Sequence, residues 1–185
     1  VNRLFWVMSD QAETSDVSVG GPRTLPGMLK WRAQMTPHEV ARWTLDLHGQ
    51  WQSESWAEVL RSVVSITHGL KVSGLREGAH VGIIAPTSAA WDDCSMAVMA
   101  LRGVVVGIDA HAGFDAVQEL LHLVPIDAIV IDRADRLQLL GDACPPITIV
   151  LSHSGDFLPA GCVDVAKLQQ LSVDPNETEW NLAAP

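Results

Sequence analysis

Apolar residues recur along this chain in two patterns that alternate with each other. Four short runs rich in Val and Ile, without strict alternation, predict strands at residues 80–86 (HVGIIAP), 104–109 (VVVGID), 127–132 (DAIVID) and 147–152 (ITIVLS). Strands of this composition are buried on both faces, as in a parallel sheet. Helical patterns occupy 88–102, 114–124 and 133–140 between them. These segments are long enough to be crossovers, so the pattern predicts right-handed βαβ units.

A longer helix is predicted just before this series. Ser55 is followed three residues later by Glu58, which is the spacing of a capping box, and Gly74 is placed to end the helix. The apolar positions that recur at helical spacing, and so predict the buried face, are Trp56, Val59, Leu60, Val63, Val64 and Leu70. The positions expected on the opposite face are Arg61, Ser62, Ser65 and His68.

Residues 28–56 predict a short helix followed by a hairpin, with strands VARWTLD and WQSES around the turn LHGQ. The four tryptophans expected to pack in the core or at its rim are Trp31, Trp43, Trp51 and Trp56. The predicted fold class is therefore α/β: a three-layer sandwich with a mainly parallel sheet flanked by helices, plus an N-terminal β-hairpin. Three segments follow: a flexible N-terminal arm over 1–27, an α/β subdomain over 28–152, and a linker or tail over 153–185 with a possible short helix at 163–171.

Composition narrows the classes of function. The 185 residues include 22 acidic and 12 basic side chains, and a net charge of -10 would repel a phosphate backbone, so nucleic-acid binding is not expected. A membrane-spanning helix needs about 20 successive apolar residues, and no such run occurs in the sequence. The three cysteines, Cys94, Cys144 and Cys162, are far apart and lack CxxC spacing, which favours the reducing cytoplasm.

Candidate chemistry is sought first at the carboxyl ends of the predicted strands, where open α/β sheets bind ligands. Thr87 and Ser88 begin a helix there and are placed to hold an anion or simply to cap the helix. Capping is favoured, because neither GxGxxG nor GxxxxGK[ST] occurs in the sequence. Asp109 and His111 follow the second strand, and ordinary loop polarity is favoured over a base or ligand role.

The remaining polar candidates are also given structural interpretations. Adjacent residues on a helix point about 100° apart, so Asp92 and Asp93 are not expected to share a site and are expected to offset the helix dipole. The charge cluster expected to cap and solvate a helix consists of Asp132, Arg133, Asp135 and Arg136. Cys94 is predicted to be buried and inert, while Met96 and Met99 lie on an apolar helix that is expected to be core, with an acyl pocket as the alternative.

The order of these elements resembles the N-terminal subdomain of the adenylate-forming (AMP-binding) acyl-CoA synthetase superfamily, nearest to its long-chain fatty-acid CoA ligases. The motifs that carry the resemblance are Thr36-Pro37, Ser55 to Glu58, Gly74 to Ile83, Thr87 to Trp91 and Arg102 to Ile108, over roughly residues 28–152. Each motif alone is weak, and their order and spacing together are more specific. Departures from the family pattern at Ala79, Thr87, Ala90 and Gly107 indicate a divergent member.

The resemblance implies an acid-thiol ligase that activates a carboxylate as acyl-AMP with ATP and Mg and then transfers the acyl group to CoA. The family's Thr/Ser/Gly-rich nucleotide loop would be expected after NETEWNLAAP, that is, beyond Pro185. No catalytic, cofactor-binding or metal residue is therefore assigned, and residues 1–185 are expected to be non-catalytic by themselves. The expected partner is the remainder of the synthetase or a second copy of the chain. The alternatives are a stand-alone interaction or acyl-binding module and an unrelated flavodoxin-like domain.

Overall fold

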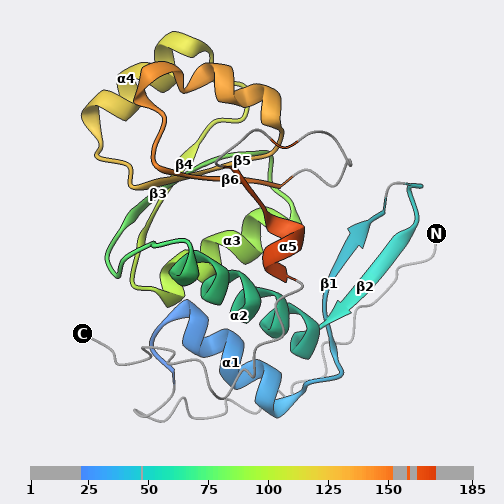
Figure 1. The fold of residues 1–185 in the computed structure, drawn as a ribbon. Coiled ribbons are helices and arrows are strands. Elements are labelled where there is room, and N and C mark those ends of the chain that lie inside the picture. The colour runs from blue at the N-terminus through green and yellow to red at the C-terminus, as the bar shows by residue number, and fades with distance from the viewer. Residues whose placement is uncertain (1–21, 47, 152–157, 159–161, 170–185) are drawn as a thin grey trace, which may run out of the picture.

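The computed structural model describes residues 22–46, 48–151, 158 and 162–169 (Figure 1). Its first part consists of α1 (Leu25–Met35), the hairpin β1 (Val40–Leu45) and β2 (Trp51–Ser55), and α2 (Trp56–Val72). There follow β3 (His80–Ile84), α3 (Ala89–Ala100), β4 (Val104–Ile108), α4 (Phe114–Leu123) and β5 (Ala128–Ile131). The last elements are the 3₁₀ helices η1 (Ala134–Leu139) and η2 (Gly141–Ala143), then β6 (Ile147–Val150), β7 (Cys162–Asp164) and α5 (Val165–Gln169).

A five-stranded parallel sheet in the order β4-β3-β5-β6-β7 forms the middle layer. Figure 1 shows α2, α3 and α5 on one face, with α1 outside them, and α4 on the opposite face. Each face has its own apolar core: Val81, Ile83 and Val130 point toward α2 and α3, while Ile84, Ile129 and Ile131 point toward α4. The predicted fold class is confirmed.

The central strands are buried on both faces, as their composition predicted. All four residues of β5 are buried, as are four of the five residues of β3. The edge strand β4 is more open, and Val104 is 45% exposed. The sheet continues past residue 152, because β7 pairs with β6 and leads into α5. The sequence does not predict β7, because three residues are too few to form a recognisable apolar run. The short helix predicted over 163–171 begins instead at Val165, since Val163 and Asp164 belong to β7.

Helix α2 begins with the predicted capping box. The Ser55 amide donates to Glu58 Oε2 at 2.7 Å, and the Glu58 amide donates to Ser55 Oγ at 3.3 Å. Gly74 follows the helix with φ +93, a left-handed conformation that glycine adopts without strain. The predicted polar face holds for Arg61, which is exposed, but is wrong for Ser65, which is only 1% exposed.

Other predictions need correction. The segment predicted as a helix over 133–140 is instead the 3₁₀ helix η1, two turns long, and the left-handed Gly141 (φ +50) follows it. Helix α1 begins at Leu25, so residues 25–27 are helical and do not belong to the predicted arm. The predictions for residues 1–21 and for most of 153–185 concern segments outside the described residues.

The tryptophan prediction is wrong for three of the four side chains. Trp31, Trp43 and Trp51 are 48%, 60% and 64% exposed, and only Trp56 is half-buried, where it packs against the core. The Arg32 guanidinium lies 5.6 Å from the centre of the Trp56 ring. The reason for the error is that two of these residues lie on the β1–β2 hairpin, which is a separate two-stranded sheet beside the main one (Figure 1).

Candidate functional site

The strand order creates one preferred place for a ligand. The chain passes from β3 to β4 on one side and then returns to β5 on the other side of β3. In open parallel sheets, such a reversal leaves a crevice at the carboxyl ends of the two strands. Here the loop that starts at Ala85 follows β3, and Asp132 follows β5. The candidate site is therefore this edge of the sheet.

A hollow of about 680 Å³ lies at the reversal point. Its wall is formed by the loop after β3 (Pro86, Thr87 and Ser88), by Asp132 and Leu151, and by the hairpin. Ser88 is the N-cap of α3, and its Oγ accepts a hydrogen bond from the Trp91 amide at 3.2 Å. The capping interpretation of Ser88 is thus confirmed, while Thr87 is exposed at the rim.

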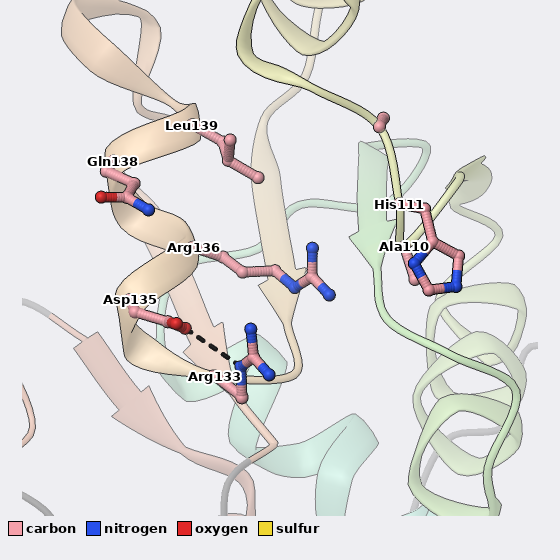
Figure 2. A pocket seen from close by; sticks show the side chains of 8 residues that line it. Ala110, His111, Arg133, Asp135, Arg136, Gln138 and Leu139 are labelled. Carbon is pink, nitrogen blue, oxygen red and sulfur yellow. Dashed lines mark hydrogen bonds and ion pairs between the residues drawn. The ribbon is translucent and has the colours of Figure 1, made fainter.

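A second hollow of about 290 Å³ lies between the loop after β4 and η1 (Figure 2). It brings His111, which follows β4, together with Arg133, Asp135 and Arg136, which follow β5 on the other side of β3. Asp109 is not part of its lining, since its carboxylate accepts from the His111 amide at 2.8 Å in a local turn. Figure 2 shows Arg136 extending from η1 into the space that His111 faces from the other side.

The charges around this second hollow cancel in pairs. Arg133 Nε donates to Asp135 Oδ1 at 3.1 Å, and Arg136 donates to Asp132, the residue that directly follows β5. Two guanidinium groups that are each paired with a carboxylate leave little net attraction for a phosphate. The predicted solvating role holds for Arg133 and Asp135, whose side chains are 63% and 61% exposed, but not for Arg136 and Asp132, which are 14% and 18% exposed. The predicted capping role is wrong, because no side chain caps η1.

The most buried charge in this region lies behind the first hollow. Asp93 of α3 is 2% exposed and accepts from Arg42 Nη1 at 2.6 Å, from Arg42 Nη2 at 3.1 Å and from Ser62 Oγ at 2.5 Å. Arg42 Nε donates to Glu54 Oε2 at 2.6 Å across the hairpin. Gln169 extends the chain of bonds, since its amide donates to Ser62 Oγ at 2.9 Å. We refer to these five residues as the Asp93 network.

The Asp93 network fixes the hairpin to three helices. Burial by itself would lower the pKa of Arg42, but its hydrogen bonds to Asp93 and Glu54 outweigh burial and raise that pKa. The guanidinium is therefore permanently charged and permanently paired. The dipole interpretation fits Asp92, which lies in the first turn of α3, and misses the main role of Asp93. The sequence did indicate that Asp93 is buried, because Asp93 lies on the same helix face as Ala97 and Ala100, which are core residues.

An apolar groove of about 480 Å³ runs between α1, β1 and α3. Its floor and walls include Met28, Trp31, Trp56 and Met96. Helix α3, which contributes Met96 to the groove, also carries Cys94. This residue is 1% exposed, and burial raises the pKa of its thiol to about 12. The prediction that Cys94 is buried is confirmed, and the raised pKa of its thiol agrees with the low reactivity expected for it. Met96 is half-buried and packs against the core, which is the role expected for it, and it also lines this groove.

The described ranges offer neither a group of metal ligands nor a membrane-spanning helix. Within these ranges, no three His, Cys, Asp or Glu side chains are grouped closely enough to hold a metal ion. None of the described helices is both long and apolar enough to cross a membrane.

Comparison with known proteins gives the family. The model of the AMP-binding enzyme family matches residues 29–184, and the chain belongs to this family. A curated polyketide synthase-nonribosomal peptide synthetase from Aspergillus clavatus is 22% identical over 138 residues, which are 73% of this chain and 3% of that protein.

Solved structures of enzymes share the fold. Acetoacetyl-CoA synthetase from Streptomyces lividans aligns with a TM-score of 0.71 and 21% identity over 81% of this chain and 25% of its own. The anthranilate CoA ligase AuaEII, in complex with anthranoyl-AMP, aligns with a TM-score of 0.66 and 17% identity over 78% of this chain and 27% of its own. The chain therefore spans about a quarter of the length of these enzymes, and the fold it shares with them is that of their adenylate-forming N-terminal subdomain.

Proposed function

We propose that this chain is the N-terminal part of an ATP-dependent acyl-CoA synthetase. The whole enzyme would activate a carboxylate as acyl-AMP and then form a thioester with CoA. The observation that carries this proposal is the family match over residues 29–184, in a chain whose fold aligns with acetoacetyl-CoA synthetase at a TM-score of 0.71. For the acid we propose a long-chain fatty acid, on the motifs between Thr36 and Ile108, and for its location the cytoplasm, which suits the free thiols.

The described residues would act in that enzyme as a support for the site rather than as its reacting groups. Mg-ATP needs anionic ligands for the metal and unpaired donors for the phosphates. The guanidinium groups of Arg133 and Arg136 already have carboxylate partners, and the Ser88 hydroxyl is engaged in capping α3. These groups do not fit Mg-ATP, so we assign no step to them and propose that residues 1–185 alone form no acyl-AMP.

An assay with two protein lengths tests this proposal. The 185-residue chain and the product of the same gene read past Pro185 would each be incubated with ATP, magnesium and a labelled fatty acid. We expect acyl-AMP, trapped with hydroxylamine, only from the longer product. Acyl-AMP from the 185 residues alone would overturn the supporting role. A longer product that carries a Thr/Ser/Gly-rich loop followed by Lys and yet adenylates no carboxylate would overturn the ligase proposal.

We further propose that the exposed apolar face of the hairpin is covered by the rest of the synthetase or by a second copy. Trp43, Leu45 and Trp51 expose more than half of their surface, and monomeric proteins rarely leave such side chains grouped in solvent. Light scattering of the 185-residue chain at increasing concentration should show self-association that Trp43→Ser with Trp51→Ser reduces. A wild-type chain that stays monomeric at high concentration would contradict this proposal.

A second candidate is a stand-alone acyl-binding module, favoured by the apolar groove lined by Met28, Trp31, Trp56 and Met96. The tryptophans provide the readout, because an acyl chain in the groove should change the fluorescence of Trp31 and Trp56. Met28→Asp would place a charge in the groove at an exposed position, and Val72→Asp, exposed on α2 away from the groove lining, is the matched control. Saturable binding of a fatty acid that only Met28→Asp weakens would support this candidate.

A further inference from the structure

Two of the three cysteines meet on one face of the sheet, although 18 positions separate them in the sequence. Cys144 follows η2 in the loop before β6, and its Sγ lies 3.6 Å from Thr148 Oγ1. Thr148 in β6 is the direct register partner of Cys162 in β7. Neither cysteine is in a disulfide, Cys144 is exposed, and Cys162 is half-buried.

The side chains of Thr148 and Cys162 point to the same face. Register partners in neighbouring parallel strands project their side chains to the same side of a sheet, about 4.8 Å apart. Thr148 is two positions from Val150, which belongs to the core beneath α4, and Cys162 packs against that same core. The Cys144 thiol therefore lies above Thr148 on the side where Cys162 projects, one strand away.

The electrostatics of Cys162 agree with this placement. Burial raises the pKa of the Cys162 thiol, and the negative charge of a nearby Cys144 thiolate raises it further. Only a thiol close to Cys162 has such an effect, since screening in water suppresses the interaction between distant charges.

We propose that Cys144 and Cys162 form a dithiol site that a low-molecular-weight disulfide oxidises to an intramolecular disulfide. The exposed Cys144 thiolate attacks one sulfur of the small disulfide, and the S–S bond breaks to release one thiolate. The Cys162 thiolate then attacks Cys144 Sγ in the mixed disulfide and releases the second thiolate. The protein loses two electrons and two protons, and the small disulfide gains them as two thiols.

The bond would fasten the last strand of the sheet. Strand β7 has three residues and, among the described strands, pairs with β6 alone, so few of the described hydrogen bonds hold it. It leads directly into α5, where Leu168 packs on Gly69 of α2 and Gln169 reaches Ser62. A disulfide to Cys144 would join β7 to the loop before β6 covalently. In a reducing compartment the site would rest as the dithiol and respond to a rise in disulfide concentration.

The experiment treats the full chain with oxidised glutathione and follows intact mass and cysteine-containing peptides. We expect a species that has lost two hydrogens, with residues 144 and 162 in one linked peptide. Cys94→Ala is the matched control and should react like wild type, because Cys94 is buried and inert. Cys162→Ser should stop at a glutathione adduct on Cys144. The internal bond should form faster as pH rises, because the pKa of Cys162 is raised.

A comparison with the urea-unfolded chain isolates the contribution of the fold. If β6 and β7 hold the thiols together, the ratio of internal disulfide to glutathione adduct should be about tenfold higher in the folded protein, from the gain in effective concentration. An equal ratio in the two states would overturn the proposal. So would a folded wild-type protein that stops at the Cys144 adduct or forms only disulfides between molecules.

Discussion

Replacing Asp93 with alanine tests whether the Asp93 network holds the hairpin in place. The change removes a carboxylate that is 2% exposed and leaves the Arg42 side chain, itself 17% exposed, without its two-pronged partner. Breaking a buried ion pair typically costs about 3–5 kcal/mol. Arg42 keeps Glu54 at 2.6 Å and some contact with solvent, so we expect a loss of about 2–4 kcal/mol in the free energy of unfolding.

The neighbouring carboxylate provides the control. Asp92 is exposed in the first turn of α3, where a negative charge gains about 0.3–1 kcal/mol from the helix dipole. Urea unfolding of Asp93→Ala and Asp92→Ala, followed by circular dichroism, compares two identical chemical changes at adjacent positions. Equal losses in the two variants would refute the reasoning, because burial and pairing with Arg42 would then contribute nothing measurable.

Two further predictions concern stability. Ser55→Ala removes the cap of α2 and should cost about 1 kcal/mol at neutral pH. Hydrogen bonds from the Ser55 hydroxyl and amide lower the pKa of Glu58. The stability gained by this carboxylate is therefore present above its ordinary pKa of 4.5 and is lost as pH falls through the lowered pKa. In urea titrations at acid pH, the free energy of unfolding of Glu58→Gln should therefore approach that of wild type. Gly103→Ala places a Cβ 2.8 Å from the Ala79 carbonyl oxygen and should cost about 1–3 kcal/mol in thermal unfolding, whereas Gly107→Ala, at an exposed position of the edge strand β4 with nothing within 4 Å, should be nearly neutral.

The main sheet could be predicted from the sequence because its signals are local and agree with one another. Runs such as HVGII and AIVI are too short and too apolar for a surface helix, and the segments between them have helical periods. The capping box at Ser55 marks the start of α2 to the residue. Signals of this kind depend on residues within a few positions of each other, which is why they can be read without tertiary contacts. Strand β7 lacks such a signal, since it depends on pairing with β6.

The arrangement of the candidate site could be predicted only in part. The sequence placed His111 and Arg133 after two predicted strands, but not beside each other, because it does not show that β4 and β5 lie on either side of β3 and that their following loops meet. The partner of Asp93 could not be predicted, because Arg42 lies 51 positions earlier, in a hairpin that forms a separate two-stranded sheet. The exposure of Trp43 and Trp51 has the same origin. The hydrophobicity of a side chain predicts that it is buried, but it does not predict which helix or strand packs against it.

The Asp93 network also raises the question of why an ion pair lies where an apolar pair would be stable. Two well-packed apolar side chains often replace a buried ion pair without loss of stability, so Arg42→Met with Asp93→Leu should recover most of the loss seen in Asp93→Ala. Apolar contacts, however, do not fix direction as a two-pronged guanidinium-carboxylate pair does. We therefore expect the double variant to be stable but to exchange the amide hydrogens of β1 and β2 faster, in native-state hydrogen exchange, than wild type does. If β1 and β2 exchange at the wild-type rate in a stable double variant, the network adds nothing to the position of the hairpin beyond filling space.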